Sequence, residues 1–442
     1  KLDENKNTLL AALKTDDEKR TDEQRLLIAG RHQASAPAFT NLKDKKASLI
    51  KQRDALNRSL PKVMVMADMA KPRKTFVLNR GLYNKPTDEV QPGLPSFLTP
   101  SSSRKPNASI DSEPPANRLT LARWLVDSQN PLTARVTVNR FWQQIFGIGL
   151  VKTTEDFGTQ GEVPAQMDLL NWLAKTFQQN GWNVKQLVRT IVTSHTYRQS
   201  SIIPNQHTCE RDPDNRLLSR ASRHRLPAWM LRDQALAASG LLSPINGGPS
   251  VNTYQPKGIW EEASFGKKKY TQDSGEKLYR RSLYTYWRRI IAPTMFFDNA
   301  SRQTCTVKAS RTNTPLHALQ TLNNTAYVEA ARTLAQLSLL KHPVNLLKHP
   351  DNEQQPESTD ADRIDTIMKR VLARPASEAE REILLRGVNR TRGQFADGSK
   401  DALALLAVGE SDRDENISPA ELAAWTNLCL AILNLDETLN RE

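Results

Sequence analysis

The chain has 442 residues, enough for two or three domains with a sizeable core. Its mean hydropathy of −0.59 indicates much polar surface, and the sequence has no run of about 18 apolar residues, which excludes a helix that crosses a membrane. The net charge of +14 favours acidic partners such as nucleic acid, sulfated or carboxylated glycans or an acidic redox protein, although a basic surface that only maintains solubility explains it equally well.

Residues 1–61 are predicted to form a helical hairpin that ends a preceding domain. In its second helix Leu42, Leu49 and Leu56 recur every seven residues among charged side chains, a spacing that indicates a short coiled-coil seam. Gly, Ser and Pro gather at residues 30–37, where we expect the turn of the hairpin.

Residues 62–116 are predicted to hold a short β segment and a connector. The segment KVMVMADMAKPRKTFVLNRG alternates like two short strands that meet at Lys71–Pro72. The tract from Pro86 to Pro115 contains seven prolines and many serines, so we expect an extended connector on the surface.

Residues 117–341 are predicted to form a central helical domain. Pro131 and Gly147 bound one amphipathic helix, and Thr314 caps another that extends to about residue 339. Within this domain RRSLYTYWRR (280–289) combines basic and aromatic residues and alternates like a strand.

A polar, flexible insertion at residues 342–361 is expected to separate this domain from a C-terminal helical subdomain at 362–442. Capping boxes at Ser377–Glu380 and Ser418–Glu421 indicate where two of its helices begin. The predicted fold class is therefore mainly α: a multi-helix domain with a small β element and an N-terminal helical hairpin.

Three long blocks of sequence carry a resemblance to a known family. They begin with VMVMADMAKPRKTFVLNRG, NRLTLARWLVDSQNPLTARVTVNRFWQQIFGIG and PKGIWEEASFGKKKY, and the last block ends in GESDRDENISPAELAAWTNLCLAILNLDE. From about Val63 to Glu442 the chain resembles the C-terminal region of the planctomycete-type, cytochrome c-associated exported proteins, a family without an established reaction.

The resemblance implies that a signal peptide, a c-type cytochrome domain and a further helical domain precede this region in a longer protein. We therefore expect a periplasmic or cell-surface location, haem c on that preceding domain, no cofactor within this chain, and the cytochrome domain of the same polypeptide as a partner. The first residues, KLDENKNTLL, contain no signal peptide. Similar proteins often occur beside sulfatase and polysaccharide-degradation genes, which implies a carbohydrate substrate. No oligomeric state is predicted.

One departure from the family pattern concerns acid–base chemistry. Pro227-Ala228-Trp229 occupies the place where members usually carry an acidic residue before the pair Arg232–Asp233. An acid–base role at that acidic position is therefore in doubt for this chain.

Polar residues at interior-facing helix positions are the first site candidates, because a buried polar group must be paired or it costs free energy. Asn139 and Arg140 lie in the helix after Pro131, and the guanidinium of Arg140 could bind a substrate carboxylate or sulfate. The alternative is structural: Arg140 pairs with Asp156 or Glu162 and holds the following loop. These two carboxylates flank the glycines of DFGTQGE, where they form either an acid–base couple or part of the loop.

His195 is the best histidine for a general base, a metal ligand or a haem axial ligand. The alternative is a hydrogen-bonded core residue beside Tyr197. No HxH, HExxH or two-histidine-plus-carboxylate spacing occurs, so no metal site is predicted.

Basic and aromatic residues interleave in two segments, at 216–232 and 267–289. They could line an electropositive groove with stacking surfaces, which suits sugars with sulfate or uronate groups and also single-stranded nucleic acid. A solvated basic face is the alternative. The members that we single out as substrate-binding are Arg225, Arg232, Trp287 and Arg288.

The last candidates lie in DNASRQTCTVKASR, which contains Asp298 and Cys305. Neighbouring cations could lower the pKa of the Cys305 thiol, but no histidine is adjacent to complete a nucleophilic pair. The other cysteines, Cys209 and Cys429, are distant, and the chain has no CxxC or CxxCH motif, so we expect buried free thiols. GxSxG, GxGxxG and P-loop motifs are absent as well.

The leading hypothesis is a module of a cytochrome c-linked protein that binds acidic or complex polysaccharide or oxidises it as a haem-coupled oxidoreductase. In the predicted cleft His195 would move a proton, Asp156 or Asp298 would orient it, and the substrate would be held by Asn139, Arg140, Arg225, Arg232, Arg288 and Trp287. A non-catalytic scaffold is the alternative, and nucleic-acid binding is the least favoured function.

Overall fold

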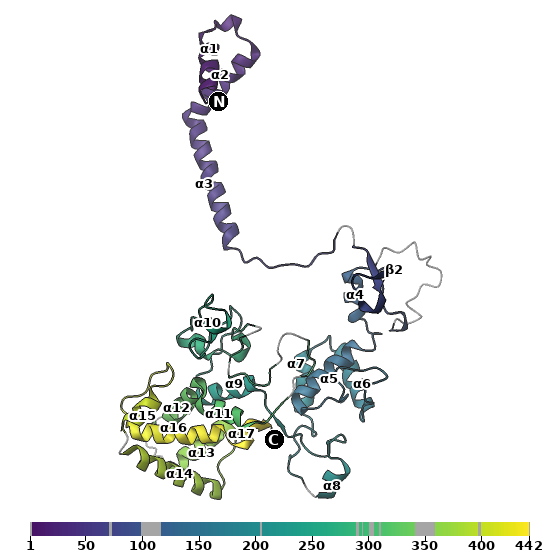
Figure 1. Ribbon diagram of the computed structural model, residues 1–442, viewed down its shortest axis with the longest axis vertical. Helices are drawn as coiled ribbons and strands as arrows, with labels where there is room; N and C mark the ends of the chain where they lie inside the picture. Colours follow the sequence, from purple (N-terminus) through teal and green to yellow (C-terminus); the bar gives the residue numbers. More distant parts are fainter. Residues whose placement is uncertain are drawn as a thin grey trace. The chain divides into compact units, whose positions relative to one another are not determined.

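The computed structural model describes residues 2–69, 73–98, 116–203, 206–288, 291–293, 295–299, 305–308, 311–340, 359–396 and 399–441. The chain divides into two compact units, residues 1–94 with 109–121, and residues 95–108 with 122–442 (Figure 1). The described residues are mainly helical and contain two small antiparallel sheets. The prediction of a mainly α fold with a helical N-terminal region is confirmed. No helix in the described part of the chain combines the length and the apolar character that crossing a membrane requires.

The first unit begins with helices α1 (Leu2–Lys14), α2 (Asp22–Ser35) and α3 (Pro37–Ser59). Between α1 and α2 lies the short 3₁₀ helix η1 (Asp17–Lys19). Arg20 holds this turn, because its Nε donates to the carbonyl oxygens of Ala12 at 3.2 Å and Thr15 at 3.0 Å. The α2 and α3 helices are separated only by Ala36, and Pro37 occupies the first turn of α3. No residue of α3 is buried.

The first sheet pairs β1 (Thr75–Leu78) with β2 (Pro86–Val90), on either side of η2 (Asn79–Gly81). The predicted strand at 63–69 is wrong, because these residues are irregular and exposed in the structure. The partner of β1 instead comes from the start of the predicted connector, with Thr75 opposite Val90 and Phe76 opposite Glu89. The expected junction at Lys71–Pro72 and most of the connector lie outside the described residues.

Helix α4 (Arg118–Leu125) begins in the first unit and ends in the second. In the second unit α5 (Thr133–Phe146), α6 (Met167–Gln179) and α7 (Val184–Val192) pack around one apolar cluster. Its buried side chains include Val138, Trp142, Phe146, Leu170, Phe177 and Ile191. As predicted, Gly147 ends α5, with a φ of 78° that a side chain would strain.

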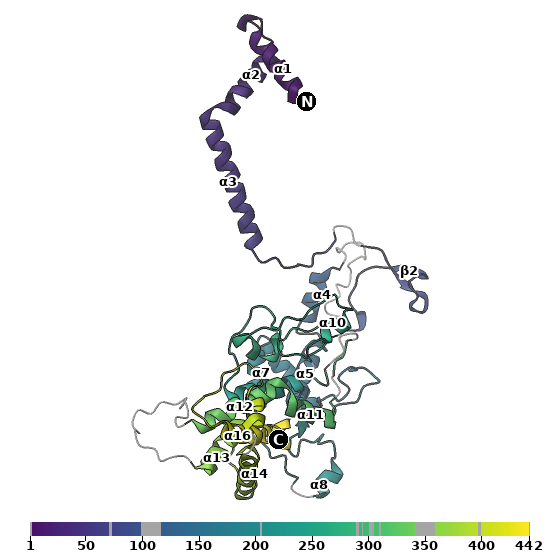
Figure 2. The same cartoon turned by 60° about the vertical axis from the view of Figure 1, so that its left-hand side comes forward.

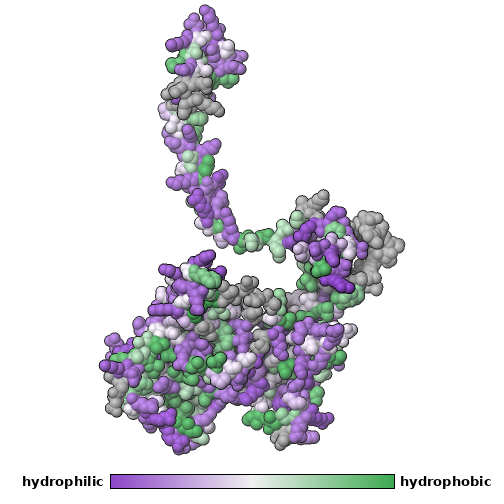
Figure 3. All heavy atoms as spheres, viewed as in Figure 1, coloured by the Kyte–Doolittle hydropathy of each residue, from purple (hydrophilic) through white to green (hydrophobic). Residues whose placement is uncertain are grey.

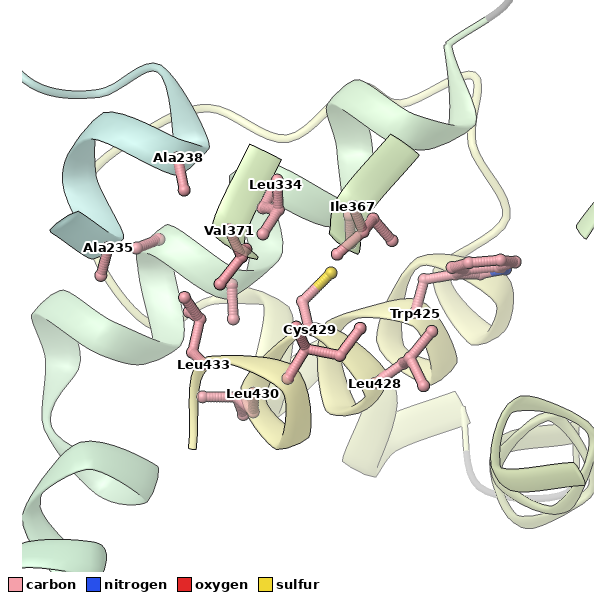
Figure 4. Packing of buried hydrophobic residues seen from close by; sticks show 14 of the residues in the cluster. Ala235, Ala238, Leu334, Ile367, Val371, Trp425, Leu428, Cys429, Leu430 and Leu433 are labelled. Carbon is pink, nitrogen blue, oxygen red and sulfur yellow. The ribbon is translucent and has the colours of Figure 1, made fainter. Parts of the chain in front are cut away.

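The larger core of this unit surrounds α16 (Pro419–Leu433), whose neighbours include α12 (Thr325–Leu339), α14 (Glu378–Ala396) and α15 (Ser399–Leu406). Figure 4 shows the sulfur of Cys429 pointing towards the apolar side chains of Leu334, Ile367 and Val371. The remaining helices here are α9 (Ala228–Ser239), α11 (Pro315–Asn323), α13 (Asp360–Leu372) and α17 (Asp436–Leu439). Most of the predicted insertion lies outside the described residues.

A short sheet joins the two cores of the second unit. Strand β3 (His224–Arg225) pairs antiparallel with β4 (Asn440–Arg441). The guanidinium of Arg441 donates to the carbonyl oxygen of Ile145 in α5 and lies 4.2 Å from the ring centre of Tyr197. The end of the chain therefore fastens the α16 core to the α5–α7 cluster.

The predicted strand at 280–289 is wrong. The 3₁₀ helix η5 (Gly275–Tyr279) precedes it and η6 (Ser282–Tyr284) lies within it. In the part of it that the structure describes, to Arg288, the residues after η6 form only isolated bridges, such as Thr285 with Val251. The remaining short elements are α8 (Gln206–Arg211), α10 (Ile259–Ala263) and η3 (Ser96–Leu98). Figure 2 shows α10 among long irregular segments, so the basic and aromatic residues here are carried by loops and by short helical turns.

Candidate functional site

The second unit contains one large cleft, with a volume of about 1260 Å³. Its walls include the end of α5, residues between Pro213 and Trp229, residues 298–299, 306–308 and 311–313, and Asn440 of β4. Two of the predicted site residues, Arg225 and Asp298, line it together.

The cleft has an excess of positive charge. Its basic side chains are Arg220, Arg223, Arg225, Lys308 and Arg311, and its carboxylates are Glu155, Asp214 and Asp298. Asp214 pairs at 2.7 Å with Lys152, which does not line the cleft, and Arg223 pairs with Asp436. The remaining guanidinium and ammonium groups give the cleft a field that favours an anionic ligand.

Asp298 organises one wall of the cleft. Its two carboxylate oxygens accept hydrogen bonds from the backbone N–H of Thr312 at 2.6 Å and from the Thr312 hydroxyl at 2.7 Å. Asp298 has a φ of 58°, a left-handed conformation that costs about 1 kcal/mol in a residue with a side chain. These bonds hold the wall at residues 312–313, where Asn313 accepts a hydrogen bond from Nη1 of Arg225 at 3.1 Å.

His317 lies behind this wall and is buried. Its Nε2 is 3.9 Å from a carboxylate oxygen of Asp298 and 3.4 Å from the Thr312 hydroxyl. The ring stacks on Phe297, with 3.9 Å between ring centres. Burial lowers the pKa of Arg225, and the negative charge of Asp298 partly offsets this lowering. The arrangement can fix the Arg225 guanidinium at the cleft surface and hold a carboxylate beside it, which is suited to binding and orienting an anion.

His224 forms another part of the cleft and lies against the end of α5. A Cβ atom added at Gly147 would come within 2.8 Å of the His224 ring, so this glycine is required by the close contact as well as by its φ. Burial and then the charges of Arg311 and Arg441 lower the pKa of His224 to about 4. The imidazole is therefore neutral at pH 7.

We expect His224 to make the protein less stable in mild acid. Its pKa in the unfolded chain is near 6.5, so between pH 6.5 and 4 the unfolded state binds a proton that the folded state does not. The contribution of neutral His224 to the free energy of unfolding is therefore fully present above pH 6.5 and falls as the pH drops to about 4. Below that pH this residue causes no further change. Because the ring is partly exposed, the loss should be about 1–2 kcal/mol.

Thermal unfolding at pH 7.0 and 4.5 checks this prediction. The variant His224→Gln should lose less stability than the natural chain over that interval, because the carboxylates titrate in both. An equal loss in the two proteins would show that His224 is not responsible.

The other predicted site residues lie outside the cleft lining. Asn139 is buried; its side-chain amide donates to the backbone carbonyl oxygen of Val151 at 3.0 Å and accepts from the Val151 N–H at 2.9 Å. Arg140 is exposed on α5, and Asp156 accepts a hydrogen bond from the N–H of Gly158 at 2.7 Å within its own turn. The alternative pairing of Arg140 with Asp156 or Glu162 is not formed, because Arg216 approaches Glu162 instead, at 3.5 Å.

The remaining four are also dispersed. His195 is exposed, with its Nδ1 3.5 Å from Arg198. Arg232 is 2% exposed and bonds backbone carbonyls. Trp287 packs edge-on against Phe296, and Arg288 lies 5.9 Å from the ring centre of Trp260. Their roles in binding or catalysis stay predictions, and the structure gathers only Arg225 and Asp298.

Two kinds of cleft residue were missed. Trp229 lines the cleft with 40% of its surface exposed, although the sequence drew attention to it only as a departure from a family pattern. Lys308 and Arg311 are among the cations near Cys305, for which the sequence suggested only an effect on the pKa of that thiol. A tryptophan two residues after a helix-starting proline and a basic segment with threonines were the signals available in the sequence.

The cysteines differ in their surroundings. All three are free; Cys429 is buried, Cys209 is half-buried at the cleft, and Cys305 is exposed. The expectation of buried thiols is therefore wrong for Cys305, which lies on a surface loop. Burial raises the pKa of the Cys429 thiol. Within the described ranges, no group of three or more histidine, cysteine, aspartate or glutamate side chains is placed to hold a metal ion.

Comparison with known proteins gives one match. The model of a family described as PSD1, protein of unknown function (DUF1553), matches residues 117–388, more than half of the chain, and every residue that lines the cleft except Asn440 falls in this range. No curated protein and no solved structure matches.

Proposed function

Because the chain belongs to the PSD1 family of proteins of unknown function (DUF1553), the family supplies no reaction, and we propose from the cleft itself that this protein binds acidic carbohydrate. The observation that carries the proposal is the excess of guanidinium and ammonium groups over carboxylates in one cleft of about 1260 Å³. Sulfate and uronate groups are the anions that such forked donors bind well.

Two further features bear on the choice between a sugar and a nucleic acid. Trp229 is 40% exposed beside the cations; an aromatic face can pack on a pyranose ring or on a base, so this residue fits either ligand. Asp298 and Glu155 also line the cleft; their oxygens can accept hydrogen bonds from sugar hydroxyls, whereas they would repel a continuous phosphate backbone. A ligand with separated anionic groups and many hydroxyls therefore fits best.

The finer form of the proposal rests on the sequence resemblance. We place this region in an exported, cytochrome c-linked protein of the periplasm or cell surface, where the bound polysaccharide would be oxidised by a haem-coupled reaction. Because the chain has no CxxCH motif, haem c would be held by another domain of the polypeptide, and no residue of this chain is assigned to it.

A non-catalytic scaffold is the second candidate. Among the three residues predicted to be catalytic, only Asp298 reaches the cleft, and it uses both carboxylate oxygens to hold Thr312. His195 and Asp156, which were expected to move and orient a proton, line no part of it. The cleft can therefore bind without performing a reaction.

Calorimetry with a sulfated oligosaccharide tests the proposal, with a neutral oligosaccharide and single-stranded DNA as comparisons at one ionic strength. We expect saturable binding of the sulfated sugar. Arg225→Ala and Trp229→Ala should each lower the affinity at least about tenfold, since each removes a central contact worth about 1.4 kcal/mol or more.

The matched control is Arg189→Ala, which removes an exposed arginine from α7 outside the cleft and should change the affinity less than about twofold. Thermal unfolding of each variant confirms that it is folded. Equal losses in all three variants, or weak binding of every polyanion that disappears with salt, would contradict a site in the cleft.

A further inference from the structure

Helix α3 carries an apolar stripe along its length. The helix has 23 residues, or about 35 Å, and Leu42, Leu49 and Leu56 recur on one side of it. These three side chains are 66%, 55% and 62% exposed. The three leucines span two heptads, about four turns, and occupy one position of each, as a seam residue of a coiled coil does; such a seam requires a second helix to cover it.

Nothing in its own unit covers this stripe. No residue of α3 is buried, and among the described residues of that unit no helix runs beside it (Figures 1 and 2). An isolated helix gains little from propensity alone, and most helical stability in proteins comes from packing of an apolar face. The seam therefore lacks the packing that stabilises such helices.

The segment that follows α3 also carries exposed apolar side chains. Val63, Met64, Val65 and Met66 are each at least 80% exposed, and Figure 3 shows this run as hydrophobic surface directly after the helix. Apolar side chains in a continuous exposed run mark a surface that another molecule covers. Two neighbouring segments thus point to one docking region.

The positive charges beside the leucine seam favour an acidic partner. Leu42, Leu49 and Ile50 line a shallow groove with Lys45, Lys46 and Arg53. The only acidic residues of α3, Asp44 and Asp54, lie at helix positions away from the leucine seam. The carboxylate of Asp54 nevertheless pairs with the guanidinium of Arg53 at 2.8 Å. A second copy of α3 would place lysines against lysines, which is unfavourable.

We propose that α3 is a docking surface for an acidic amphipathic helix of a partner protein, with which it forms a short two-stranded coiled coil. The partner would place leucines against Leu42, Leu49 and Leu56, and glutamates beside Lys45 and Lys46. This inference does not depend on the ligand of the cleft, which lies in the other unit.

A synthetic acidic helix tests the proposal on the full chain. The probe is a labelled peptide of about three heptads with leucine in the seam and glutamate at the flanking positions, and its binding is followed by fluorescence anisotropy. A scrambled peptide of the same composition and a peptide with lysine in place of glutamate are the comparisons. We expect only the first to bind the natural chain.

Variants in α3 then locate the contact. Leu49→Asp should abolish binding, and Lys45→Glu with Lys46→Glu should weaken it at least tenfold and confer binding of the lysine peptide. The control is Lys51→Glu on the outer side of the helix, with less than a twofold effect. Because α3 buries no residue, none of these changes should alter the thermal unfolding of the rest of the chain.

Three outcomes would overturn the inference. Equal binding of the scrambled peptide would reduce the contact to charge alone. A dimer in sedimentation velocity that Leu49→Asp dissociates would identify a second copy as the occupant. Strong protection of α3 amides from hydrogen exchange in the free monomer would show that another part of the same chain covers the seam.

Discussion

Replacing Arg232 by methionine is expected to lower the free energy of unfolding by about 3–5 kcal/mol. The side chain is 2% exposed, and its guanidinium donates to the carbonyl oxygens of Leu278 at 2.7 Å and Arg280 at 2.9 Å. It also lies 3.4 Å from a carboxylate oxygen of Asp233. Methionine fills a similar volume, but it leaves two carbonyl groups and a carboxylate without this donor where water has little access.

Urea unfolding followed by circular dichroism measures the loss. The matched control is Arg281→Met, which replaces a neighbouring exposed arginine and should change the free energy by less than about 0.5 kcal/mol. If Arg232→Met were as stable as the control and instead weakened oligosaccharide binding, the original interpretation of Arg232 as a substrate ligand would be correct.

Several helix ends could be predicted, because neighbouring residues determine them, although the helix predicted from Thr314 to about residue 339 is two helices, α11 and α12, that meet at Asn324. Pro37 occupies the first turn of α3 and Gly147 ends α5. The capping box at Ser377–Glu380 forms as predicted, with the Ser377 N–H donating to Glu380 at 2.8 Å. The one predicted at Ser418–Glu421 does not, because Glu421 instead binds Arg392 and the Trp425 indole.

Strands were predicted less well, because a strand exists only where a distant segment pairs with it. Residues 63–66 form a continuous apolar run that is compatible with a strand, yet they remain unpaired in the structure. Residues 86–90 begin with proline and pair with β1 all the same, since proline is tolerated as the first residue of a strand. Local pattern could not distinguish the two segments.

The candidate site shows the same limit. Arg225 and Arg232 lie seven residues apart in one basic segment, but Arg225 lines the cleft whereas Arg232 is enclosed between α9 and residues 278–282. Asp156 and Asp298 both lie in polar loops of similar composition, but only Asp298 lines the cleft. Residue type predicted the chemistry, and tertiary packing decided which residues share a surface.

A buried carboxylate in α12 joins the loop before α16 to the core. Glu329 is fully buried, and its Oε1 accepts hydrogen bonds from the Tyr279 hydroxyl at 2.8 Å and from the N–H groups of Glu410 at 2.7 Å and Ser411 at 2.6 Å. Burial and then Glu329 raise the pKa of Tyr279, so this tyrosine stays a donor. The backbone must approach very closely at Gly409 to make these bonds.

Gly409→Ala is therefore expected to cost about 3–5 kcal/mol of stability. The φ of Gly409 is 91°, and an added Cβ would lie 2.4 Å from the Glu329 side chain, so the carboxylate must move away from its three donors. Urea unfolding measures the loss, and Gly387→Ala is the control, because its Cβ meets no atom within 4 Å and alanine favours a helix by about 1 kcal/mol. In the double variant with Glu329→Ala the total loss should be smaller than the sum of the two single losses, since the contacts with the outer carbon atoms of Glu329 are gone and only the one with its Cβ atom, at 2.7 Å, remains. Additive losses, or a loss below about 1 kcal/mol for Gly409→Ala alone, would mean that this contact does not hold the loop.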